Sequence, residues 1–115
     1  MNVFTKLKAM LMYREAVQRA NEAHTKRGTR YYVLPSEDGK LVVLDRYDLK
    51  MLKRRHYMRS EVKVIDLVRD SFYFTPYSSG DGAMHPDEIE RGKKRVCIWW
   101  EHHKALQKKI RNSKK

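Results

Sequence analysis

The clearest chemical feature of the sequence is a run of basic residues within the segment Asp45–Arg59. At the 3.6-residue period of a helix, the basic side chains from Arg46 to Arg54 fall on one continuous arc. Lys and Arg on one helix face can contact the phosphates of a nucleic-acid backbone. The alternative is that this arc is only the solvated face of a helix. The candidate nucleic-acid-binding residues are Arg46, Lys50, Lys53, Arg54, Arg55 and Arg59, with Lys104, Lys108, Lys109 and Arg111 near the C-terminus.

A second group, Cys97, Glu101, His102 and His103, contains side chains that can bind transition metals. Structural zinc sites combine paired ligand motifs, and the sequence contains neither CxxC nor HExxH. We therefore predict that His103 faces the core and His102 faces solvent, with no metal or other cofactor bound. The sequence also offers no Ser-His-Asp or Cys-His arrangement. We therefore do not expect an enzyme, and no small-molecule substrate is evident.

The net charge of +12 over 115 residues favours a polyanionic partner, which would be DNA, RNA or an anionic membrane surface. The positive charge is concentrated in residues 1–30, 46–60 and 91–115. A membrane surface is less favoured, because the basic helices lack the large exposed apolar face that such binding needs. No segment is suited to a signal peptide or a membrane span, and Cys97 is the only cysteine. These features predict a cytoplasmic protein in a reducing compartment.

These side chains need a folded scaffold, and 41% hydrophobic residues suffice for the core of one domain. We predict a single domain over residues 1–112 and a frayed basic tail over 113–115. The first element is a helix over Asn2–Arg27, closed by Gly28. Its large apolar residues are expected to be buried: Val3, Phe4, Leu7, Met10, Leu11 and Val17. A second face carries Ala9, Ala16, Ala20 and Ala23, which either admit another helix at close range or reflect only helix propensity.

A β-hairpin is predicted from Arg30–Leu34 and Leu41–Leu44, which are rich in β-branched and aromatic residues and flank a turn containing Asp38-Gly39. Strand side chains alternate between faces, so only one of Tyr31 and Tyr32 can face the core. The other tyrosine could stack on an unpaired base. We favour the alternative that it covers the outer face of the hairpin beneath a helix.

Three further helices are predicted after the hairpin. Asp45 and Asp48 suggest a capping box that starts the basic helix, with Leu49, Leu52 and His56 on its buried face. The next helix is predicted over residues 61–74, with a strand over 62–65 as the alternative. The pair loosely resembles a helix-turn-helix, but the second helix, which reads the groove in that motif, is acidic here. Sequence-specific binding is therefore not expected.

The last helix is predicted from Pro86 to about Asn112. Its buried stripe is Ile89, Gly92, Val96, Trp99, Trp100, His103, Leu106 and Ile110. The complete pattern predicts a compact α+β domain in the order α-β-β-α-α-α, with the hairpin packed against helices. The favoured function is nucleic-acid binding through backbone phosphates, and the alternative is a protein-interaction or homodimerisation module. The candidate interface residues are Ala9, Ala16, Ala20, Ile98 and Trp99.

Overall fold

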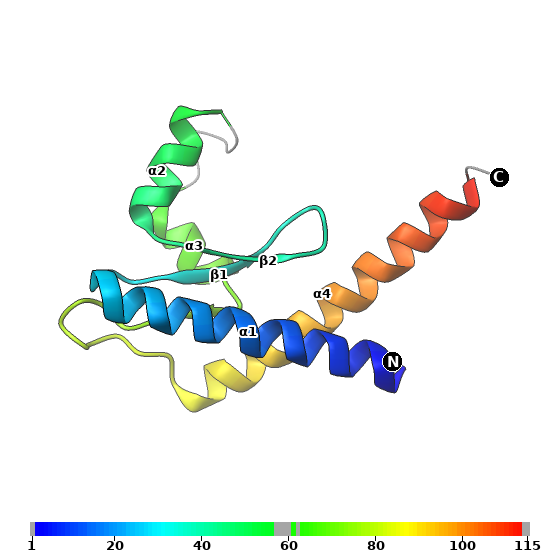
Figure 1. The fold of residues 1–115 in the computed structure, drawn as a ribbon, viewed down its shortest axis with the longest axis horizontal. Coiled ribbons are helices and arrows are strands. Elements are labelled where there is room, and N and C mark those ends of the chain that lie inside the picture. Colours follow the sequence, from blue (N-terminus) through cyan, green and yellow to red (C-terminus); the bar gives the residue numbers. More distant parts are fainter. Residues whose placement is uncertain (1, 57–60, 62, 114–115) are drawn as a thin grey trace.

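A computed structural model describes residues 2–56, 61 and 63–113, and shows a three-layer α+β fold (Figure 1). A three-stranded antiparallel sheet in the order β2-β1-β3 forms the middle layer. Helices α1 and α4 pack on one face of the sheet, and α2 and α3 pack on the other. The elements are α1 (Val3–Arg27), β1 (Tyr32–Pro35), β2 (Leu41–Leu44), α2 (Arg46–Arg54), α3 (Val64–Asp70), β3 (Tyr73–Phe74) and α4 (Pro86–Ser113). The predicted class and order are confirmed, with one strand added before the last helix.

The predicted hairpin is formed by β1 and β2, in a register that pairs Tyr32 with Leu44 and Pro35 with Leu41. In the turn, Gly39 has a φ of 81°, a backbone conformation that side chains with a Cβ adopt rarely. A Cβ at Gly39 would also meet the ring of His103, because the tip of the hairpin rests on α4. The turn glycine therefore serves both the local geometry and the contact between the hairpin and α4.

Strand β3 replaces the end of the helix predicted over residues 61–74, which was too long. Helix α3 ends at Asp70, and Tyr73 and Phe74 then pair with Val33 and Tyr32 of β1. The alternative strand over 62–65 is also wrong for the described residues of that segment, because Val64 and Ile65 are helical. A two-residue strand is too short to produce an alternating pattern, so its pairing depends on the neighbouring strand β1.

Alternation along β1 divides the core into two clusters. Tyr31 and Val33 face α1 and α4, whereas Tyr32 and Leu34 face α2 and α3. Both tyrosines are buried, which confirms that the outer face of the hairpin is covered by helices. Neither ring has a free face on which a base could stack.

The buried face of α1 differs from the prediction. The side chains of Ala9, Ala16 and Ala20 are fully buried, whereas Phe4 and Leu7 are 79% and 61% exposed. Val3 and Leu11 are exposed as well, and Met10 and Val17 are partly buried. The small alanine side chains let α4 and the sheet approach the helix closely, so the large apolar residues lie on the opposite face.

The close approach of α4 depends on Gly92. A Cβ at this position would lie 2.1 Å from the backbone oxygen of Phe72, so only glycine fits without a shift of the backbone. The predicted apolar stripe is buried at Val96 and Trp100. Leu106 and Ile110 were predicted to be buried too, but α4 extends beyond the sheet and both remain 49% exposed (Figure 1). No helix within the described ranges is long and apolar enough to cross a bilayer.

Candidate nucleic-acid interface

Helix α2 is held by the predicted capping box at its N-terminus. The Asp48 amide donates to Asp45 at 2.8 Å, and the Asp45 amide donates to the Asp48 carboxylate at 3.0 Å. The Thr29 hydroxyl donates a third hydrogen bond to the buried Asp45 carboxylate, at 3.2 Å. Leu49, also buried, packs against the sheet. The capping box and the packing of Leu49 together fix which face of α2 points to solvent.

The outward face of α2 carries the predicted basic arc. Arg46, Lys50 and Arg54 are exposed, Lys53 is partly buried, and Arg55 follows as the exposed C-cap. None of these five cations forms an ion pair with a carboxylate of the described residues. Arg59, the remaining candidate of this segment, lies outside the residues that the structure describes.

His56 lies after the end of α2 rather than on its buried face. Its side chain is exposed and its backbone has a φ of 63°. The prediction that His56 is buried with Leu49 and Leu52 is therefore wrong. The helical period does not extend to His56 because α2 ends at Arg54.

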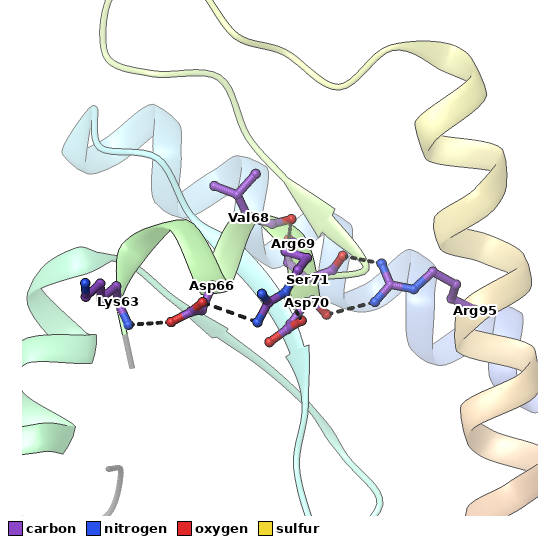
Figure 2. Close-up of polar contacts among 7 residues, drawn as sticks. All are labelled: Lys63, Asp66, Val68, Arg69, Asp70, Ser71 and Arg95. Atoms are coloured by element: carbon purple, nitrogen blue, oxygen red, sulfur yellow. Dashed lines mark hydrogen bonds and ion pairs between the residues drawn. The ribbon is translucent and has the colours of Figure 1, made fainter. Parts of the chain in front are cut away.

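The acidic residues of α3 do not neutralise the α2 arc (Figure 2). Arg69 pairs with Asp66 at 3.2 Å and with Asp70 at 3.1 Å, and the Lys63 amide donates to Asp66 at 2.8 Å. Arg95 of α4 donates to the backbone oxygens of Asp70 and Ser71 and fixes the end of α3. Both carboxylates of α3 therefore pair with Arg69, and neither pairs with a cation of α2.

A shallow groove runs beside the basic arc, between α2 and the start of α3. Its volume is about 330 Å³, and Arg46, Lys50 and Lys53 lie along one wall, with Leu49 and Val64 at its apolar part. Helix α2 ends at Arg54 and α3 begins at Val64, a longer spacing than the turn of about three to four residues in a helix-turn-helix. The groove therefore suits contact with a backbone rather than with base edges.

Arg30 is a basic residue of this region that the sequence pattern missed. It is only 9% exposed, and its guanidinium lies over the ring of Tyr77 at 3.7 Å and over that of Phe74 at 4.6 Å. Its Nη2 donates to the backbone oxygen of Gly82. Arg30 and Arg46 both line a second, smaller cavity of about 160 Å³. No local signal distinguishes Arg30, because the residues around it follow far later in the chain.

The buried Tyr32 phenol lines the same small cavity. Burial raises the pKa of Tyr32, and the charge of Arg30 opposes this rise only in part. The hydroxyl therefore stays protonated at neutral pH and can donate a hydrogen bond into the cavity.

The C-terminal basic residues form a separate group. Lys104, Lys108, Lys109 and Arg111 are exposed on the distal part of α4. Lys104 lies 5.0 Å from the ring of Trp100. In Figure 1, this end of α4 and helix α2 lie at opposite ends of the long axis of the molecule. The predicted basic segments therefore do not join in one patch.

The remaining predicted site residues fall into two classes. Ala9, Ala16 and Ala20 cannot form a surface for another subunit, since they lie in the core of the chain itself. Ile98 is exposed, and the half-buried Trp99 ring lies 5.9 Å from that of Phe72. The interface prediction is therefore wrong for the three alanines, whereas Ile98 lies on the surface.

The predicted orientations of the C-terminal histidines are confirmed. The His103 ring stacks on Trp99 and Trp100 with centroids 6.1 and 5.7 Å away, whereas His102 is exposed. Within the described part of the chain, no three metal-binding side chains converge.

Comparisons with protein-family models, with curated protein sequences and with solved structures find no match to this chain.

Proposed function

We propose that this protein binds nucleic acid through backbone phosphates along the basic face of α2. The observation that supports the proposal is the absence of carboxylate partners, among the described residues, for the cations of this face. Elsewhere in the structure, cations such as Arg69 and Lys93 pair with neighbouring acids. Cations without an internal partner leave a positive potential that a phosphate backbone can neutralise.

The proposed contacts are independent of nucleotide sequence. The side chains on the arc are Lys and Arg at a solvent-exposed surface, and the groove beside them is shallow. Such contacts position a strand without reading its bases. The exposed cations of the distal part of α4 are a separate surface, so the proposal is restricted to α2 and its groove.

Affinity for a single- or double-stranded oligonucleotide is expected to fall steeply with added salt. Each phosphate contact contributes roughly −0.7 (single strand) to −0.9 (duplex) to the slope of log K against log salt. Four contacts, from Arg46, Lys50, Lys53 and Arg54, therefore predict a slope of about −3 to −4. Fluorescence anisotropy across a salt series would measure it. A flat salt dependence, or no binding at low salt, would contradict the proposal.

Self-association is a second candidate function, supported by the apolar face of α1. Phe4, Leu7 and Leu11 are 79%, 61% and 51% exposed and follow one another at helical spacing. A second copy of the chain would offer the same apolar face, so pairing about a two-fold axis would bury both faces at once.

The double variant Leu7→Glu/Leu11→Glu is expected to be monomeric at concentrations where the native chain forms dimers. Light scattering over a dilution series would measure the mass of both proteins. Lys26→Glu, at an exposed position near the other end of the same helix, is the control and should leave the dimer intact. A native chain that is monomeric at every concentration would refute self-association.

A further inference from the structure

The buried charge of Arg30 lacks a counter-ion. No carboxylate lies within ion-pair distance of its guanidinium in the described part of the chain, and its buried Nε has no hydrogen-bond partner. Burial of a charged group is costly unless the group is paired and hydrogen-bonded. The Tyr77 and Phe74 rings and the Gly82 carbonyl offset only part of this cost. The environment of Arg30 is thus suited to an anion.

The cavity that Arg30 lines is equipped to hold such an anion. Arg46 provides a second guanidinium, and the hydroxyl-bearing residues Tyr32, Tyr77 and Ser78 line the same space. The Tyr77 and Ser78 hydroxyls form no hydrogen bond with another described residue, and the Tyr32 hydroxyl, to which the Arg30 guanidinium can only donate, keeps its own proton free to donate. Guanidinium groups favour phosphate because their N–H groups match two of its oxygens at once.

The Asp45 carboxylate, which accepts from the cavity-lining Thr29, is already occupied. Asp45 accepts hydrogen bonds from the hydroxyl of Thr29 and the amide of Asp48, and it does not line the cavity. Thr29 does line the cavity, but its proton is directed to Asp45. Asp45 therefore does not take the place of the missing counter-ion of Arg30.

The size and charge of the cavity select the ligand class. Its volume of about 160 Å³ is well below the roughly 300–1,000 Å³ typical of pockets for drug-sized ligands. A space of this size suits a small anionic group such as a single phosphate. The two guanidinium charges match a phosphate monoester, which carries a charge of about −1.5 to −2 at neutral pH.

We infer that the cavity between Arg30 and Arg46 binds a phosphate monoester, and that its natural source is the terminal phosphate of a nucleic-acid strand. Arg46 and Val64 line both this cavity and the groove along α2, so the two spaces adjoin. A strand whose end enters the cavity would continue past Lys50 and Lys53. The choice of a strand end as the source rests on the proposed function, whereas binding of the phosphate group does not.

Inorganic phosphate is the first probe of the cavity. At constant ionic strength, phosphate is expected to raise the melting temperature of the native protein above its value in chloride. Phosphate also stabilises folded proteins in general, so Arg46→Ala and Ser78→Glu should show a clearly smaller rise than the native protein, and an equal rise in these variants would overturn the inference. Both positions are exposed, so the fold should survive. Gln107→Glu adds the same charge at an exposed position of α4 and should retain the rise. A native protein whose melting temperature is the same in phosphate and chloride would overturn the inference.

The second experiment identifies the source of the phosphate with two oligonucleotides of one sequence, with and without a 5′-phosphate, and with a nucleoside monophosphate. The native protein is expected to bind the phosphorylated strand at least tenfold more tightly, and Ser78→Glu should remove this preference. Equal, salt-dependent affinity for both strands would overturn the strand-end site and leave the proposed function standing. Binding of the monophosphate without binding of either strand would refute the proposed function and show that the source is a free phosphate compound.

Discussion

Replacing Gly92 with alanine is expected to lower the free energy of unfolding by about 2 kcal/mol, as is typical of overpacked cores. The added methyl group would lie 2.1 Å from the backbone oxygen of Phe72, where no side-chain rotation can relieve the contact. The higher helix propensity of alanine would by itself stabilise α4 by about 1 kcal/mol. The clash exceeds this gain, so the sign of the effect tests whether α4 packs as closely as the structure shows. Denaturant unfolding followed by circular dichroism would measure it.

Lys94→Ala is the control for this substitution, because Lys94 is exposed on the same helix. Its effect on the free energy of unfolding should stay within about 0.5 kcal/mol. A Gly92→Ala protein as stable as the native one, or more stable, would mean that α4 does not approach Phe72 so closely.

The double variant Lys50→Ala/Lys53→Ala is expected to bind nucleic acid roughly 25- to 60-fold more weakly at 0.1 M salt. Loss of two phosphate contacts reduces the magnitude of the salt slope by about 1.4 for a single strand and 1.8 for a duplex. If the two proteins bind equally at about 1 M salt, these slope differences make the variant roughly 25- to 60-fold weaker after a tenfold dilution of the salt to about 0.1 M. Both side chains project from the outward face of α2, so the fold should be unaffected. A salt series with both proteins would give the change in slope directly.

The double variant Lys6→Ala/Lys8→Ala removes the same net charge from exposed positions of α1. If α2 forms the interface, this control should bind almost as tightly as the native protein. Equal losses in both variants would show that binding follows net charge alone and would contradict an interface on α2.

The elements that were predicted correctly are those set by neighbouring residues. Asp45 and Asp48 are three positions apart and form the capping box of α2. The Asp38-Gly39 turn and the strands beside it form the hairpin, and Gly28 closes α1. Each of these signals acts within a few residues, so the sequence pattern is sufficient to find it.

The features that were missed depend on contacts between distant segments. The face of α1 that becomes buried is chosen by the approach of α4 and the sheet, which pack on the alanines rather than on the large apolar residues. Strand β3 exists because β1 offers Tyr32 and Val33 as partners. Arg30 is enclosed by Phe74 and Tyr77, more than forty positions later in the chain. Helical period and charge contain no information about such partners.

The pairing of β3 with the distant strand β1 has a consequence for when the small cavity forms during folding. The β1–β2 hairpin involves neighbouring segments and can form within microseconds, whereas pairing of β3 with β1 requires a long loop to close. The cavity is lined by Arg30 just before β1, by Arg46 at the start of α2 and by Ser78 after β3. We therefore expect the cavity to be complete only once β3 has paired with β1. A ligand held there would slow unfolding rather than accelerate folding, and would lengthen the lifetime of the native state.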